Sequence, residues 1–351
     1  MTKKDSLHFL LYALLTLLAT FLVVLIILPK NETKLSPPDE EDGIPGINVQ
    51  SDIPGAILPI PNLSPEELQS GKVLLGEKLF HDPRLSGDGT VSCATCHILS
   101  HSGTDGKKIA EGTGNALGDF NTPTVFNAVF NFRQFWDGRA DTLAEQVSGP
   151  LESIAEMASS WTFAVRQVSQ DKEYRRAFDH EYGGEISERT ISDAIAHFEA
   201  TLLTPNSAFD RFLNGDATAI SDDAKEGYRL FNDYGCVSCH QGINIGGNFF
   251  QRFGVMGDYF VDRGNPTKAD LGRYNVTKQE EDRHVFKVPG LRNVAVTAPY
   301  FHDGSTETLE QAIGIMGRYQ LGRELSEKDR HHIAAFLESL TGEYRGELLR
   351  P

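Results

Sequence analysis

Apolar residues recur at intervals of three and four positions in several parts of the chain. Clear examples are residues 191–203, 222–231 and 326–340. This spacing places the apolar side chains on one face of a helix. Signals for β-strands are few, so the pattern predicts an all-α protein.

Two helix starts carry further local signals. Ser64 is followed by Pro65 and by two glutamates, which predicts a helix from there to about residue 80. Ser326 supplies a similar cap for the last helix. Residues 100–121 are rich in Gly, Ser, Thr and Asp and lack a helical period, so they are expected to form a long loop.

The N-terminal part of the chain differs from the rest. Residues 7–28 contain no Asp, Glu, Lys or Arg, and the run is about long enough for a helix to cross a membrane. Residues 1–30 are therefore predicted to be a membrane anchor, with a cleaved signal segment as the main alternative. Residues 31–56 are acidic and proline-rich, which predicts a tether, and the folded part should begin near residue 57.

The charge of the chain narrows the choice of partner. The 351 residues carry a formal net charge of −16. This charge argues against nucleic acid or an anionic membrane surface, and it favours a cationic partner such as a small basic redox protein. Acidity that only maintains solubility is an equally good interpretation of the charge alone.

The candidate chemistry lies in a five-residue pattern that occurs twice. The chain reads Cys-Ala-Thr-Cys-His at residues 93–97 and Cys-Val-Ser-Cys-His at residues 236–240, and these motifs use all four of its cysteines. The C-x-x-C-H spacing attaches haem c: Cys93 and Cys96, or Cys236 and Cys239, bind the porphyrin, and the adjacent histidine binds the iron. A redox dithiol or half of a zinc site are the alternatives, but neither explains the histidine in both copies. The sequence therefore predicts two covalently bound haem c groups.

The approach to each motif is also repeated. A Gly-x-x-Leu-Phe stretch begins at Gly76 and again at Gly227. This repetition indicates an internal duplication, in which each stretch lies on a helix that packs over a haem; coincidence in two amphipathic helices is the alternative. Pro205 and Asn206 end a helical run. We therefore expect one haem domain at residues 57–205 and a second at residues 206–351.

Three further segments resemble the bacterial di-haem cytochrome c peroxidases. They are Asn-Thr-Pro-Thr-Val-Phe-Asn at 121–127, Phe-Trp-Asp-Gly-Arg at 135–139 and Thr-Ala-Pro-Tyr-Phe-His-Asp-Gly at 297–304. The similarity covers nearly everything after residue 57. It implies two cytochrome c-like haem domains and an enzyme that reduces hydrogen peroxide to water in the periplasm. Related di-haem enzymes that mature tryptophylquinone cofactors resemble the chain less.

The resemblance gives the two haems different tasks. It implies that His97 holds the haem where peroxide is reduced, and that His240 holds a high-potential relay haem that takes electrons from a donor. Met316 lies after the second motif and just before the last predicted helix, so it is the expected second ligand of the relay haem. Histidine and methionine together raise the potential. Met256 is the competing candidate and could as easily be a core residue.

The resemblance also singles out three residues for the reaction. Glu156 matches the catalytic glutamate of the family, and Gln146 matches the amide beside it. A carboxylate in a covered pocket can accept and return a proton, because desolvation raises its pKa toward neutrality. Without the resemblance, Glu152 and Glu156 would be interpreted as solvated carboxylates. Trp136 matches a tryptophan between the haems, although an indole there would also serve as core packing.

One calcium ion is implied as well. The matching positions are Asn121, through its side chain, and Thr297 and Pro299, through backbone carbonyls. Oxygen ligands of this kind suit a hard cation. On sequence alone these three would be loop residues.

Several partners follow from these predictions. Besides hydrogen peroxide, we expect an electron donor such as a small cytochrome c, a cupredoxin or a quinol, and a homodimer. Nucleic acid is not expected. A di-haem electron carrier or redox sensor is the alternative from another functional class, and it would not need an open iron site beside Glu156 and Gln146.

Overall fold

The structure is a computed structural model that describes residues 57–351. Its α-helices are α2 (Pro65–Leu68), α3 (Gly71–Phe80), α4 (Cys93–Cys96), α5 (Leu143–Gln146), α6 (Ser148–Glu152), α7 (Trp161–Gln170), α8 (Lys172–Tyr182), α9 (Glu188–Ala200), α10 (Ala208–Leu213), α11 (Asp222–Asp233), α12 (Tyr259–Arg263), α13 (Tyr274–Thr277), α14 (Leu309–Leu321) and α15 (Glu327–Glu338). The 3₁₀ turns are η2 (Pro83–Leu85), η3 (Thr113–Asn115), η4 (Ala128–Phe130), η5 (Cys236–Ser238), η6 (Ala269–Leu271), η7 (Glu280–Asp282) and η8 (Val294–Val296). The strands are β1 (Phe250–Arg252), β2 (Val285–Lys287), β3 (Glu343–Tyr344) and β4 (Glu347–Leu348).

The predicted helices are present, with one interruption. The helix expected from Ser64 to residue 80 is divided into α2 and α3. Ser64 forms a capping box with Glu67, and Ser70 then caps a new helix by accepting a hydrogen bond from the backbone N–H of Val73. The second cap begins a separate helix, α3, and this helix alone leads toward the first haem motif.

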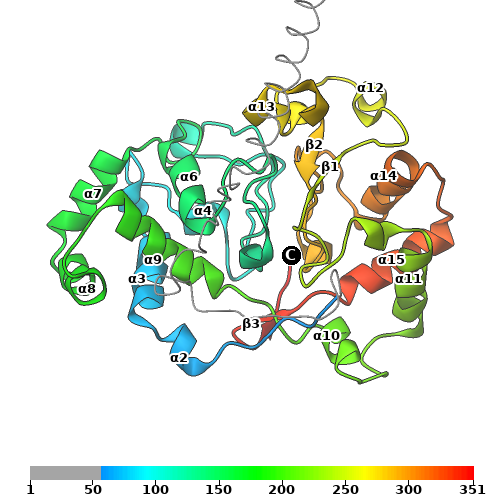
Figure 1. The fold of residues 1–351 in the computed structure, drawn as a ribbon, viewed down its shortest axis with the longest axis horizontal. Coiled ribbons are helices and arrows are strands. Elements are labelled where there is room, and N and C mark those ends of the chain that lie inside the picture. Colours follow the sequence, from blue (N-terminus) through cyan, green and yellow to red (C-terminus); the bar gives the residue numbers. More distant parts are fainter. Residues whose placement is uncertain (1–56) are drawn as a thin grey trace, which may run out of the picture. The chain divides into compact units, whose positions relative to one another are not determined.

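Two helix pairs organise the described chain. Helix α3 packs on α9, and α11 packs on α15 in the same manner (Figure 1). A methyl group added at Gly76 would overlap the carbonyl oxygen of Ala194, and one added at Gly227 would overlap that of His332. Glycine is thus required at both crossings, since any side chain would push the helices apart.

Each pair belongs to its own hydrophobic core. The first core contains Phe80, Phe178 and Phe198, all almost completely buried, and the second contains Phe209 and Phe336. Each core surrounds the helix that leads into one C-x-x-C-H motif. The aromatic side chains therefore hold the helix that positions the thiols.

The ends of the described chain cross between these cores. Near the N-terminus, Ile57 packs against the second core, and the carbonyl of Leu58 accepts a hydrogen bond of 2.7 Å from Arg292. Near the C-terminus, Leu349 is buried in the first core. Each core is therefore completed by residues from the other half of the sequence.

A buried ion pair supports this crossing. Arg292 and Asp210 are joined at 2.6 Å, and their side chains are only 1% and 3% exposed. Asp210 also accepts a hydrogen bond from the backbone N–H of Ile60. Removing one partner from such a pair would leave an uncompensated buried charge, which is strongly destabilising. The pair therefore holds the N-terminal segment at Ile60 against the second core.

The predicted fold class needs one correction. The expected membrane-spanning helix is not supported: no helix within residues 57–351 is both long and apolar enough to cross a membrane, and residues 7–28 lie outside the described range. The described chain is otherwise mainly helical, with two short antiparallel strand pairs, β1 with β2 and β3 with β4. These strands have only two or three residues, too few to leave an alternating pattern in the sequence.

The glycine crossing gives a test of the fold. We expect Gly227→Ala to lower the free energy of unfolding by about 1–3 kcal/mol, because overpacking outweighs the helix propensity that alanine gains. Gly118→Ala is the matched control, since the added methyl group would meet Ala110 at an ordinary contact distance of 3.5 Å. Denaturant unfolding of both variants measures the difference. Equal stability of the two would contradict the close crossing.

Candidate haem sites

The second motif opens into a large cavity. Cys236 belongs to η5, and Cys239 and His240 follow it directly. All three line a cavity of about 620 Å³. This volume lies within the range of cofactor pockets. Burial lowers the pKa of His240 to about 4, so its imidazole is neutral and able to bind a metal at ordinary pH.

The two candidate methionines are separated by the structure. Met316 lies within helix α14, not in a loop, and lines the same cavity as His240. Met256 is 61% exposed and packs beside Gly322. It is not among the residues that line the cavity. The geometry favours Met316, although its role as an iron ligand stays a prediction.

The first motif forms helix α4, and His97 follows at its end. The Nδ1 atom of His97 is 3.1 Å from the carbonyl oxygen of Gly103. This contact orients the ring and leaves Nε2 free for a metal, as is usual for ligand histidines. The carbonyl contact comes from the long loop that the sequence predicted at residues 100–121.

A smaller cavity lies against this motif. It encloses about 50 Å³ and is lined by Cys93, Cys96, His97, Gln146 and Glu156, among others. The volume suits a molecule the size of water or peroxide. Only the set of donor groups, and not the enclosed volume, therefore supports a haem at this motif.

The surroundings of the thiols argue against a redox pair. Burial raises the pKa of Cys96 and of Cys236 to about 11, and it also raises the pKa values of Cys93 and Cys239. Reactive cysteines have lowered pKa values, so the dithiol interpretation is disfavoured. Partly buried thiols beside a cavity, each pair followed by a histidine whose pKa is lowered by burial, fit thioether attachment of haem.

A zinc site is disfavoured by geometry. Within residues 57–351, one group of three side chains has its potential metal-binding atoms all within 4.8 Å of one another. This group consists of Asp270, His302 and Asp303. Neither C-x-x-C-H motif brings its three side chains so close together. The haem interpretation of both motifs therefore remains the best supported.

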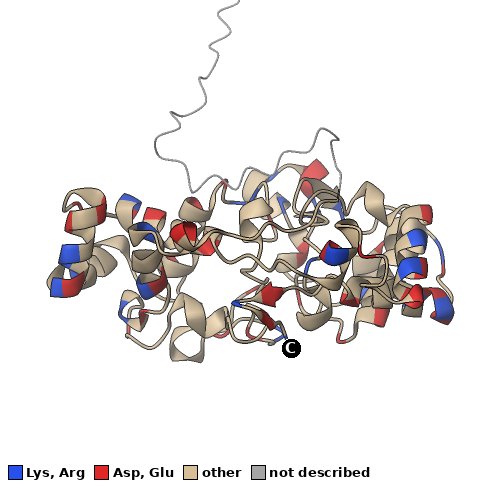
Figure 2. Ribbon diagram, turned by 90° about the horizontal axis from the view of Figure 1, so that it is seen from below, with Lys and Arg blue, Asp and Glu red and all other residues tan. Residues whose placement is uncertain are grey.

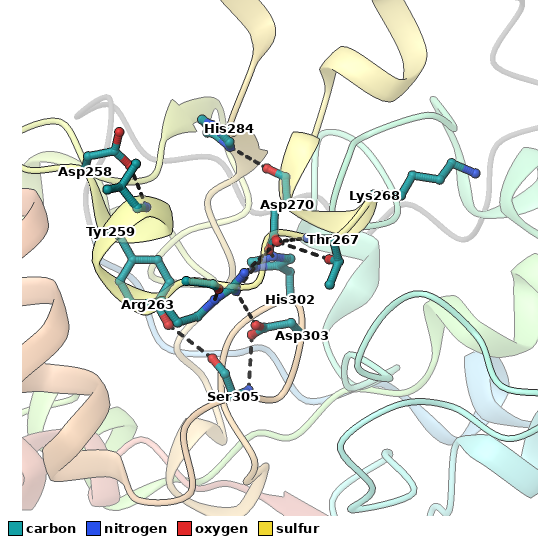
Figure 3. Close-up of polar contacts among 12 residues, drawn as sticks. Asp258, Tyr259, Arg263, Thr267, Lys268, Asp270, His284, His302, Asp303 and Ser305 are labelled. Atoms are coloured by element: carbon teal, nitrogen blue, oxygen red, sulfur yellow. Dashed lines mark hydrogen bonds and ion pairs between the residues drawn. The ribbon is translucent and has the colours of Figure 1, made fainter.

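The Asp270 group is held by a positive charge of the chain itself. Arg263 lies between Asp270 and Asp303 and is 2.6 Å from the Asp270 carboxylate (Figure 3). The Nε2 atom of His302 is 2.7 Å from the same carboxylate. Burial would raise the pKa of Asp270, but the hydrogen bonds from His302 and Arg263 outweigh it and hold that pKa well below its usual range. The group is an ion-pair network that fixes the loop of His302.

Two carboxyl groups, those of Glu156 and Glu199, line the smaller cavity. Glu156 follows helix α6. Glu152, which lies on that helix, is exposed and does not line the cavity. Burial raises the pKa of Glu156, with Arg139 and a hydrogen bond from Ser153 acting in the opposite direction. A raised pKa suits a group that gives and takes protons near neutral pH.

Sequence reasoning missed the second of these carboxyls. Glu199 on α9 is only 5% exposed and lines the same cavity, and burial raises its pKa to about 8. It lies on the face of α9 that was predicted to be apolar. A glutamate among apolar positions of that helix was the one signal that could have found it.

Trp136 lies at the large cavity, away from Glu156 and Gln146. Its indole N–H donates a hydrogen bond of 3.0 Å to the carbonyl of Asn121, and the N–H of Asn121 donates one of 2.8 Å to the carbonyl of His302. Asn121, Thr297 and Pro299 line the same cavity. Their grouping is compatible with a cation site, but calcium binding stays a prediction.

Comparisons with known proteins place the chain among the di-haem peroxidases. The profile of the family described as di-haem cytochrome c peroxidase matches residues 70–218. The chain is 50% identical to the cytochrome c peroxidase Ccp of Escherichia coli, over 82% of this chain and 61% of that protein. It is 46% identical to the cytochrome c551 peroxidase of Nitrosomonas europaea, over 82% of this chain and 84% of that one.

More distant relatives share the fold. The methylamine utilization protein MauG of Methylophilus methylotrophus is 36% identical, over 81% of this chain and 86% of its own. A solved MauG-like protein associated with microbial copper homeostasis superposes with a TM-score of 0.68 at 27% identity, covering 84% of this chain and 96% of that one. The protein therefore belongs to the di-haem cytochrome c peroxidase family. This confirms the predicted resemblance and the enzyme class, an oxidoreductase with two haem c groups.

The raised pKa of Glu199 has a consequence for stability. Between pH 4.5 and about 8 the folded protein keeps a proton that the unfolded chain has lost, so folding stability falls as the pH rises. Glu199→Gln removes this dependence. We expect the stability of the variant relative to the wild type to increase by up to about 1.4 kcal/mol per pH unit across this window.

Denaturant unfolding at about pH 5, 6.5 and 8 measures this trend. Glu152→Gln is the matched control at an exposed position and should show no comparable trend. A constant difference between Glu199→Gln and the wild type would show that Glu199 titrates normally.

Proposed function

We propose that this protein reduces hydrogen peroxide to water in the periplasm. Cys236, Cys239 and His240 would hold the haem that accepts electrons from the donor, and Cys93, Cys96 and His97 would hold the haem that supplies them to peroxide. The reaction consumes two protons and two electrons and releases two molecules of water. The observation that carries the proposal is the convergence of Glu156 and Gln146 on the small cavity at the first motif.

The small cavity supplies the groups for proton transfer. Haem iron, when bound, supplies the site at which the peroxide O–O bond accepts electrons. Glu156 would take the proton from one oxygen of the peroxide and return it to the other oxygen, which would leave as water. The Gln146 amide donates a hydrogen bond that orients the peroxide. Gln146 is the last residue of helix α5, and Glu156 lies in the turn after helix α6, where its backbone N–H donates a hydrogen bond of 3.1 Å to the carbonyl of Ser153.

The large cavity supplies the route for electrons. Met316 is proposed as the second iron ligand beside His240, which would raise the potential of that haem. Trp136 is proposed to lie on the path between the haems, since its indole lines the large cavity and is hydrogen-bonded to the segment at Asn121. Calcium at Asn121, Thr297 and Pro299 would stabilise the same region.

The setting of the enzyme is part of the proposal. Bacteria attach haem c outside the cytoplasmic membrane, which supports the periplasm. The donor is proposed to be a small cytochrome c, a cupredoxin or a quinol. We also propose two haem units that divide at Pro205 and Asn206, each completed by a chain end from the other. The predicted homodimer stays a prediction.

A steady-state assay tests the function. Purified holoprotein is given hydrogen peroxide with each of the three reduced donors in turn. Turnover with one of them supports a peroxidase and identifies the donor class. No peroxide-dependent oxidation of any donor, with two haems attached, would favour an electron carrier or a sensor.

The proposed proton transfer predicts the effect of one substitution. Glu156→Gln keeps the size of the side chain and removes the base, so turnover should fall by roughly 10² to 10⁴-fold. Glu152→Gln is the matched control and should keep its activity, because Glu152 is exposed. Haem content is measured by absorbance in both variants. Near-normal turnover of Glu156→Gln with both haems present would remove Glu156 from the mechanism.

The proposed iron ligand predicts a change in potential. Met316→Leu should lower the potential of the second haem by a sizeable part of the roughly 0.8 V range that axial ligands cover. Electron transfer from the donor should be lost with it. Met256→Leu should change neither property, since Met256 is exposed and outside the cavity. A redox titration followed by absorbance decides between the two methionines, and the reverse result would assign the ligand to Met256.

A further inference from the structure

Lys287 is a buried cation without a partner. It lies on β2, is only 8% exposed and lines the large cavity of the second motif. Its backbone is engaged, since its N–H donates a hydrogen bond of 2.9 Å to the carbonyl of Trp136. Within residues 57–351, no group forms an ion pair or a hydrogen bond with its ammonium. Desolvation is accordingly the sole influence on its pKa, which burial lowers to about 8.

The cavity offers Lys287 no protein anion. Its wall contains no aspartate and no glutamate. The chain as a whole is not short of them, since it has 49 such residues. Those within the described residues occur throughout the ribbon (Figure 2). The two arginines in the wall are satisfied elsewhere: Arg292 pairs with Asp210, and Arg252 donates to the carbonyl of Glu281. Among these three cations of the wall, Lys287 is the one whose side chain has no ion pair or hydrogen bond within residues 57–351.

An unpaired buried charge is costly, and proteins pair such groups or neutralise them. A partner for Lys287 must therefore come from the molecule that fills the cavity. Haem carries two carboxylates on its propionate side chains. Covalent attachment through Cys236 and Cys239 would place this dianion in the same cavity.

We infer that Lys287 binds a propionate carboxylate of the second haem through its ammonium group. The inference rests on the proposed assignment of a haem to Cys236, Cys239 and His240. Lys287 is then a positioning residue, because it acts on the haem periphery and not on the iron. Its charge neutralises a carboxylate that would otherwise favour ferric iron, and so it helps to keep the potential of this haem high.

The test is the potential of the second haem in the full holoprotein. In Lys287→Gln the equilibrium constant for reduction of that haem should fall at least tenfold, which is about 59 mV for one electron. Lys287→Arg keeps the charge and should restore most of the potential. Lys268→Gln is the matched control, because Lys268 is 74% exposed and its removal takes away the same charge at the surface. Its potential should equal that of the wild type.

If the Lys287→Gln variant does not fold or does not acquire its haems, a structure of the wild type tests the inference directly. An experimental structure of the wild-type holoprotein should place the lysine Nζ within about 4 Å of a haem carboxylate oxygen. A longer distance overturns the inference. So does a potential that is unchanged in Lys287→Gln.

A free anion from solution is the rival partner for the ammonium of Lys287. If such an anion binds there, the wild-type potential will depend on acetate concentration at constant ionic strength, and this dependence will vanish in Lys287→Gln. That result overturns the inference. Failure of the proposed function looks different: the pyridine haemochrome assay would find fewer than two haems per chain, or peroxide turnover would be absent with the potentials of all variants as expected.

Discussion

The close approach of two helix pairs is the constraint on which the rest of the structure depends. Helix α3 meets α9 at Gly76, and α11 meets α15 at Gly227, in each case against a backbone carbonyl. The crossings bring the helix before each C-x-x-C-H motif onto a scaffold of buried aromatic side chains. The thiols and the following histidine then line a cavity, and in the first motif the carbonyl of Gly103 in the long loop also orients the ring of His97.

The two cavities differ in the charges that line them. The small one has two carboxyls, Glu156 and Glu199, whose pKa values are raised by burial. The large one has Lys287 and no carboxyl. Carboxyls with raised pKa values suit proton transfer, whereas a cation beside a haem favours its reduced state. This contrast agrees with the proposed division between a peroxide site and an electron relay.

A short series of hydrogen bonds links the parts of the chain around Trp136. The indole is bonded to the carbonyl of Asn121, whose N–H is bonded to the carbonyl of His302, and the ring of His302 is held by Asp270. The Arg263 network thus fixes, through backbone groups, the segment that carries the proposed electron path and calcium site. The ion pairs of Arg263 with Asp270 and Asp303 already explain why these two acidic residues lie together, and no metal ion is needed to explain it.

The sequence by itself determined the local chemistry: the spacing of two cysteines and a histidine, the caps at Ser64 and Ser326, and the glycine of each repeated stretch. These features depend on neighbours a few positions away, so they can be seen in the linear pattern. Only the tertiary structure decided which ionisable groups are buried, because desolvation depends on what packs around a side chain. Lys287 therefore could not be recognised in advance, and the only sign of Glu199 was a glutamate among apolar positions of its helix. The sequence also could not predict that each end of the described chain packs against the core of the other half. This packing depends on contacts such as that of Leu58 with Arg292, 234 positions apart.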